Sequence, residues 1–141
     1  MELDFSVWFP LPEKTPYSVA KLEQMFFSIV HQTNLPKTIY IFNRQDAGTL
    51  ADKLFGIAEK KGISCEIIPA KNQFLAACAH VLAKMTTPYY IYIQNESAPV
   101  YLRQSAFGLF CWTATRKPQT GLFYAEYDLS LIHISEPTRP Y

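Results

Sequence analysis

The chain has 141 residues, of which 49% are hydrophobic and 18% are charged, so it can bury one core and does not have the composition of a disordered protein. Its 13 basic and 12 acidic residues are spread along the sequence, with no basic stripe that could neutralise a run of phosphates. Composition and charge therefore argue against duplex nucleic acid as a partner.

No uninterrupted apolar run reaches the roughly 18 residues needed to span a bilayer, so no transmembrane segment is expected. The N-terminus lacks the basic and apolar regions of a signal peptide. Cys65, Cys78 and Cys111 lie far apart in apolar surroundings and without zinc-ligand spacing. They are predicted to be reduced, buried thiols of a cytoplasmic protein.

Two strands and one helix are predicted at the start of the chain. An apolar run at residues 5–9 is followed by a proline and is typical of a buried strand. Thr15 offers an N-cap oxygen and Pro16 suits a first helical position, and apolar residues then recur at steps of three and four up to Asn34. Residues 38–42 predict the second strand.

The same alternation continues through the middle of the chain. Thr49 can cap a second helix, and Gly62 can end that helix in the left-handed conformation. Residues 65–68 predict a third strand and residues 75–85 a third helix. Residues 89–93 predict a fourth strand, which is apolar on both faces as a central parallel strand is.

A further helix is predicted from Pro99 to Pro118, followed by a fifth strand at residues 121–124. Strands that alternate with helices form βαβ units. The sequence therefore predicts an α/β fold with a mostly parallel sheet and flanking helices.

The C-terminal segment differs in kind. Residues 129–139 read LSLIHISEPTR, which resembles the translation of a common sequencing-library adapter. We expect residues 1–128 to be part of a domain and residues 129–141 to be a non-native tail, the alternative being an irregular native C-terminus. A parallel sheet that lacks its later strands keeps an unpaired edge, which favours aggregation.

Several catalytic and nucleotide-binding motifs are absent from the sequence. The five glycines form neither GxGxxG nor GxxxxGK[ST], and no GxSxG is present. His31 and His80 have no carboxylate nearby in sequence and are predicted to be helix residues without a catalytic role.

Ligands of open α/β sheets bind beyond the carboxyl ends of the strands. That rule selects four short stretches, which are either a polar-ligand site or ordinary polar loops. They are residues 10–12, 43–46, 71–73 and 94–97.

These stretches lie in segments that resemble the N-terminal, nucleotide-sugar-binding half of family-two glycosyltransferases with a GT-A fold. FSVWFP resembles the opening strand of that family, and Ser28, Ile29, Gln32 and Thr33 match its S-I-x-x-Q-T turn. KNQFLAACAHVLAKMTTPYYIYIQNES resembles the helix and strand that lead to its D-x-D motif, and GLFYAEYD a later strand. The resemblance covers residues 5–128.

The resemblance implies a Rossmann-like GT-A domain, incomplete at its C-terminus. It implies transfer of a sugar from a nucleotide diphosphate sugar to a glycan or a lipid-linked acceptor, with a divalent cation, Mg or Mn, that stabilises the leaving diphosphate. The full-length protein would work in the cytoplasm, at the inner face of the membrane. Carried over residue by residue, the nucleotide-sugar-binding positions are Pro10, Asn43, Arg44, Asn72, Gln94 and Glu96, with Glu96 as the metal ligand.

This chain departs from the family pattern at the residues that would do the chemistry. Asn43 stands where the nucleobase aspartate is expected, and Gln94 and Glu96 replace the two acids of D-x-D, which weakens cation binding. Phe74 stands where a glycine is typical. The region of the catalytic base lies beyond residue 128, so no catalytic residue is assigned and the fragment is expected to be inactive.

Two other functions stay open. One is a non-catalytic GT-A-like binding domain with a degenerate D-x-D motif, which the same substitutions favour. The other is an unrelated α/β domain that binds a small molecule.

Overall fold

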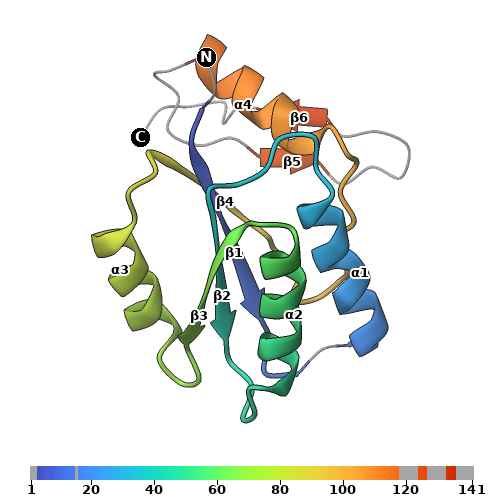
Figure 1. Ribbon diagram of the computed structural model, residues 1–141, viewed down its shortest axis with the longest axis vertical. Coiled ribbons are helices and arrows are strands. Elements are labelled where there is room, and N and C mark those ends of the chain that lie inside the picture. Colours follow the sequence, from blue (N-terminus) through green and yellow to red (C-terminus); the bar gives the residue numbers. More distant parts are fainter. Residues whose placement is uncertain (1–2, 15, 118–123, 127–132, 136–141) are drawn as a thin grey trace.

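The computed structural model describes residues 3–14, 16–117, 124–126 and 133–135 (Figure 1). Across these ranges, no helix combines the length and the apolar character that crossing a membrane requires.

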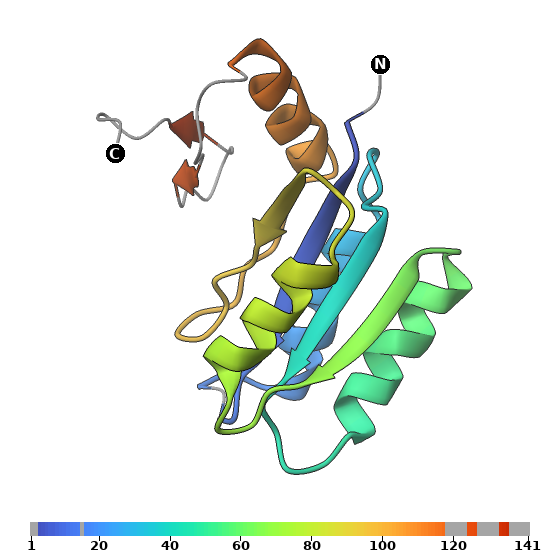
Figure 2. The ribbon, with the colours of Figure 1, turned by 90° about the vertical axis from the view of Figure 1, so that its left-hand side faces the viewer.

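Four parallel strands form the central sheet, in the order β3-β2-β1-β4. All four arrows point the same way in Figures 1 and 2, with helices on both sides. The predicted α/β fold with a mostly parallel sheet is therefore confirmed. The strands are β1 (Phe5–Leu11), β2 (Thr38–Asn43), β3 (Ser64–Pro69) and β4 (Tyr89–Tyr92).

Helices α1 and α2 cover one face of the sheet and α3 covers the other (Figures 1 and 2). Helix α4 lies at the end of the sheet where β1 begins, far from the carboxyl ends of the strands. The helices are α1 (Val19–Val30), α2 (Thr49–Lys60), α3 (Phe74–Lys84) and α4 (Ala106–Arg116).

The two faces of the sheet bury different side chains, because neighbouring residues of a strand point to opposite faces. On the side of α1 and α2, β1 contributes Phe5, Val7, Phe9 and Leu11 to a core that is aliphatic and phenylalanine-rich. On the side of α3, Trp8 packs in a second, smaller cluster. The rest of this cluster is Tyr40, Phe42, Ile68, Ala70, Ala77 and Val81.

Helix ends are where the sequence predictions needed correction. The N-cap of α1 is Ser18, whose side chain accepts a hydrogen bond of 3.3 Å from the Lys21 amide, whereas Pro16 precedes the helix and Thr15 lies outside the described residues. Thr49 is the first residue of α2 and does not cap it. The left-handed conformation of Gly62 is confirmed, with a φ of +74°.

Helix α4 begins at Ala106, so the prediction that Pro99 opens it was wrong. The preceding connector is held against α1, because the Leu102 amide donates to the Ser28 hydroxyl at 3.2 Å. The Ser28 hydroxyl thus takes an amide that could otherwise bond within a helix. No sequence pattern within residues 99–105 indicates this contact with α1.

The prediction that β4 is a central strand was also wrong. Among the described residues β4 pairs with β1 alone and forms an edge, and Tyr90 is 43% exposed. A strand that is apolar on both faces packs equally well at an edge, where tyrosine hydroxyls meet water.

The C-terminal strands form a separate sheet. Residues Tyr124–Glu126 (β5) pair in antiparallel fashion with His133–Ser135 (β6), and neither joins the parallel sheet. The predicted strand at residues 121–124 thus overlaps β5 only at its last residue, and residues 121–123 lie outside the described ranges. Of the predicted tail, residues 129–141, only β6 is described.

Candidate functional site

The strand order places a topological switch point between β1 and β4. From β1 the chain proceeds to β2 and β3 on one side, and then adds β4 on the opposite side of β1. Helices on either side of such a point lie on opposite faces of the sheet, and open α/β sheets bind their ligands beyond the carboxyl ends of the strands there. Pro10 lies in β1 at this end and is buried, and its carbonyl accepts a hydrogen bond from Asn95 Nδ2 at 3.0 Å, so its role is to hold the loop after β4.

Asn43 shapes the loop that follows β2. Its Oδ1 accepts from the Gln45 amide at 3.0 Å, and its Nδ2 donates to the Ala47 carbonyl at 3.3 Å. Gln45 in turn donates to the Pro12 carbonyl at 3.3 Å, which ties this loop to the end of β1. An amide has four hydrogen-bonding positions, so the Asn43 side chain keeps part of its capacity for a ligand.

Arg44 supplies a fixed positive charge at the same edge. Its amide donates to the Leu11 carbonyl at 3.0 Å, and its guanidinium carbon lies 5.1 Å from the centre of the Phe74 ring. Phe74 is itself held edge-on against Phe42, with ring centres 5.7 Å apart. Phe74 therefore serves as a platform for the arginine.

The loop after β3 is linked to the loop after β2 by an ion pair. Lys71 forms an ion pair with Asp46, so the loops after β2 and β3 are linked, although both side chains are exposed. Asn72 has a φ of +58°, a conformation that asparagine tolerates better than most residues, and its side chain is exposed. In this structure Asn72 makes the turn that leads into α3.

Glu96 and Gln94 are both exposed after β4. The Tyr92 hydroxyl donates to Glu96 Oε1 at 3.1 Å. Burial of Tyr92 raises its pKa, and the hydrogen bond to Glu96 raises this pKa further, so the tyrosine remains a neutral donor at physiological pH. This bond holds the Glu96 carboxylate beside the Tyr92 hydroxyl.

The described residues contain no cluster of three or more acidic, histidine or cysteine side chains that could hold a metal ion by themselves. Magnesium is also bound by one or two carboxylates together with the phosphates of a substrate. A single carboxylate such as Glu96 is compatible with that second arrangement, in which phosphate oxygens of a ligand complete the coordination.

Asn95 is the site residue that the sequence predictions missed. It is fully buried between the exposed Gln94 and Glu96, and its Nδ2 donates to the Pro10 carbonyl at 3.0 Å. The Tyr17 hydroxyl donates to the Asn95 backbone carbonyl. These bonds tie the loop after β4 to β1 and to the segment before α1. In the sequence, only the position of Asn95 inside the polar stretch could have indicated its burial.

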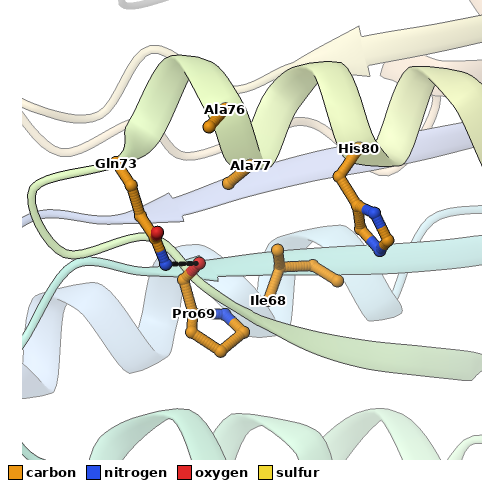
Figure 3. Close-up of a pocket in the computed structure, with 6 residues that line it drawn as sticks. All are labelled: Ile68, Pro69, Gln73, Ala76, Ala77 and His80. Atoms are coloured by element: carbon orange, nitrogen blue, oxygen red, sulfur yellow. Dashed lines mark hydrogen bonds between the residues drawn. The ribbon is translucent and has the colours of Figure 1, made fainter.

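A shallow hollow of about 230 Å³ lies between β3 and α3 (Figure 3). The Gln73 side chain reaches across it to donate to the Pro69 carbonyl at 3.4 Å, and the exposed His80 lies over Ile68. Its volume is below that of most small-molecule pockets, and apart from Gln73 and His80 its lining is apolar. We therefore place the candidate site at the carboxyl edge and not in this hollow.

The glutamine of the S-I-x-x-Q-T match has a structural role at the opposite end of the sheet. Gln32 is buried, its Nε2 donates to the carbonyls of Ser28 at 3.0 Å and Arg103 at 2.6 Å, and its Oε1 accepts from the Phe107 amide at 2.8 Å. It thus caps the first turn of α4.

Comparison with known proteins gives no relative to extend this description. No protein-family model matches the chain, and neither the curated proteins nor the solved structures yield a match to it.

Proposed function

We propose that the chain is the nucleotide-sugar-binding half of a family-two glycosyltransferase with a GT-A fold. In the full-length protein it would transfer a sugar from a nucleotide diphosphate donor to a glycan or lipid-linked acceptor, in the cytoplasm at the inner face of the membrane. The ordered sequence resemblance over residues 5–128 supports this proposal. The observation that carries it is the polar carboxyl edge of the sheet, where Asn43, Arg44 and Glu96 follow β2 and β4.

Each of these side chains matches one part of a nucleotide diphosphate. The Arg44 guanidinium lies over the Phe74 ring, and its planar donor groups can pair with phosphate oxygens. Asn43 can both donate to and accept from the edge of a nucleobase. Glu96 would hold Mg or Mn together with phosphate oxygens, and the cation would stabilise the negative charge of the leaving diphosphate.

A second candidate, a non-catalytic binding domain with the same fold, is favoured by the donor set after β4. Gln94 is neutral, and Glu96 already accepts a hydrogen bond from Tyr92. A single carboxylate in that environment binds a cation more weakly than two acids do. In this case the nucleotide would bind with no dependence on a divalent cation.

Calorimetric titration with uridine and guanosine diphosphates, with and without manganese, tests the proposal. We expect binding that Arg44→Ala weakens about tenfold or more, since a charge-assisted pair to phosphate contributes about 1.5–3 kcal/mol. Arg116→Ala is the matched control, because Arg116 stacks on Trp112 in α4 at the other end of the sheet. A folded sample that binds neither nucleotide would refute the donor-site proposal.

The cation dependence separates the two candidates. For the transferase we expect manganese to strengthen binding, and Glu96→Ala to remove that gain while Glu59→Ala, an exposed acid on α2, keeps it. Equal affinity with and without manganese would favour the non-catalytic domain.

A further inference from the structure

Helix α3 carries apolar side chains on the side that faces solvent. Leu75 is 83% exposed and Leu82 is 51% exposed. Residues three and four positions apart share one side of a helix, so the exposed leucines and alanines of α3 form one continuous apolar surface. We call this surface the α3 face, and it consists of Leu75, Ala76, Ala79, Leu82 and Ala83.

The ionisable residues of α3 lie outside the α3 face. Lys84 forms an ion pair with Glu66 of β3, and His80 lies over Ile68 (Figure 3). The exposed side of α2 is polar by comparison, with Thr49, Asp52, Lys53, Glu59 and Lys60. A helix that is apolar on its outer side as well as on its buried side usually packs against a further partner.

The order of large and small residues along the α3 face matches a second copy of itself. In an antiparallel pair with its two-fold axis at Ala79, residues three or four positions before Ala79 face residues three or four positions after it. Leu75 of one copy then meets Leu82 of the second copy. Ala76 likewise meets Ala83, and the two Ala79 residues lie on the axis. The leucines pack along one side of the helix pair, and the alanines on the other side let the two backbones approach closely.

The charges at the ends of α3 are compatible with an antiparallel pair. Before its first turn Lys71 pairs with Asp46, and in its last turn Lys84 pairs with Glu66. The acid in each pair offsets the lysine, so neither end of α3 repels the end of a second copy that lies beside it. An antiparallel arrangement also places the positive N-terminal end of each helix dipole beside the negative C-terminal end of the other.

The size of the α3 face limits how tightly a second copy can bind. The largest apolar patch on a soluble monomer usually measures about 300–600 Å². Two patches of that order facing each other bury no more than about 1,200 Å² in total, which is the lower limit of specific interfaces. A contact of this size is typical of weak, reversible association.

We propose that α3 is the contact of a symmetric homodimer, in which two α3 faces pack antiparallel across a two-fold axis at Ala79. The dissociation constant is on the order of 10–100 μM. Both copies use the same surface, so the assembly closes at two copies. The dimer requires no ligand at the carboxyl edge of the sheet, so it and the proposed function are tested separately.

Sedimentation equilibrium at increasing protein concentration tests the dimer. We expect a monomer–dimer equilibrium that Leu75→Lys weakens about tenfold or more, because each leucine pair is lost and a charge faces an apolar surface. Leu75 is 83% exposed, so a lysine there leaves the folded monomer intact. Leu35→Lys is the matched control, since Leu35 is 47% exposed in the loop before β2, and it should leave the dissociation constant unchanged.

Two outcomes of this experiment would overturn the proposal. One is a chain that stays monomeric at every concentration, and the other is an equal effect of the two lysines. If the monomeric chain sediments with phosphatidylglycerol vesicles and Leu75→Lys does not, the α3 face binds a membrane and not a second copy.

Disulfide trapping tests the antiparallel register. Ala79→Cys should crosslink two copies under mild oxidation, because residues on the axis approach within the roughly 4.4–6.8 Å that a disulfide spans between Cα atoms. Leu75→Cys should not crosslink with itself, since the two Leu75 positions lie at opposite ends of the helix pair. The unaltered chain, with Cys65, Cys78 and Cys111, gives the background. A crosslink through Leu75→Cys as strong as that through Ala79→Cys would indicate a parallel pair and would overturn the proposal.

Discussion

Cys65 shows how one residue's surroundings determine its chemistry. Burial raises the pKa of its thiol to about 12, and the neighbouring Glu66 carboxylate adds to the shift. Only the thiolate attacks alkylating reagents, so we expect iodoacetamide at pH 8 to label Cys65 far more slowly in the folded chain than in urea. Mass spectrometry follows the labelling. Equal labelling rates of Cys65 in the folded and the urea-unfolded chain would contradict this burial.

The same thiol makes stability depend on pH in a defined direction. In the unfolded chain it ionises near its ordinary value of 9, whereas in the folded chain it stays protonated up to about 12. Between these values the unfolded state binds fewer protons, so the free energy of unfolding falls as pH rises. We therefore expect the free energy of unfolding, measured by urea denaturation, to fall less between pH 8 and pH 10 in Cys65→Ala than in the unaltered chain.

At the scale of the elements, substitution by alanine should have opposite effects at Gly56, within α2, and at Gly62, just after its C-terminal end. A Cβ at Gly56 meets nothing within 4 Å, so Gly56→Ala should stabilise the helix by about 0.5–1 kcal/mol. Gly62 has a φ of +74°, and Gly62→Ala should cost about 1–2 kcal/mol. Urea denaturation checks both, and shifts of the same sign would show that the end of α2 is wrongly described.

Gln32 is the side chain that fixes α4 to α1. Gln32→Ala removes its bonds to Ser28, Arg103 and Phe107, and we expect a loss of about 2–4 kcal/mol in unfolding free energy. Hydrogen exchange should speed up first at the Phe107 amide. Gln24→Ala, an exposed position on α1, should change stability by less than about 0.5 kcal/mol, and an equal loss in both variants would contradict this role.

At the scale of the whole molecule, the two edges of the parallel sheet differ in protection. Strand β3 carries Glu66, which pairs with Lys84, and it ends in Pro69. Strand β4 reads YYIY and has neither a charge nor a proline, and among the described residues it pairs only with β1, so its outer edge can pair with another chain. An uncharged edge next to the exposed Tyr90 is therefore the expected site of association beyond the α3 dimer.

Light scattering at increasing protein concentration tests this edge. Tyr90→Lys should reduce association, because its ammonium group repels a second copy while its alkyl stem still covers Trp8, on which Tyr90 stacks at 4.0 Å. Ser64→Lys on β3 is the control and should change little. Equal effects of the two lysines would point to net charge rather than to the β4 edge.

Much of the fold and of the candidate site can be predicted from local sequence patterns. Apolar periodicity, Gly62 and the alternation of strands with helices predict the parallel sheet, because burial and backbone sterics act within a few residues. The rule for carboxyl ends also identifies the loops after β2 and β4 that contain Asn43, Arg44 and Glu96. Helix starts were less predictable, since Ser18 and Thr15 offer equivalent hydroxyls and the sequence does not say which one reaches an amide.

Long-range contacts decided the rest. The sequence by itself determined the four strands and their α/β order, whereas only the tertiary structure placed β4 beside β1 as an edge and opened the switch point there. Asn95 illustrates the reason: its burial depends on the carbonyl of Pro10, 85 positions away in sequence. In the sequence, Gln32 likewise looks like an ordinary polar helix residue. Its role depends on α4 packing against it, and hydrogen bonds between distant segments leave no local pattern.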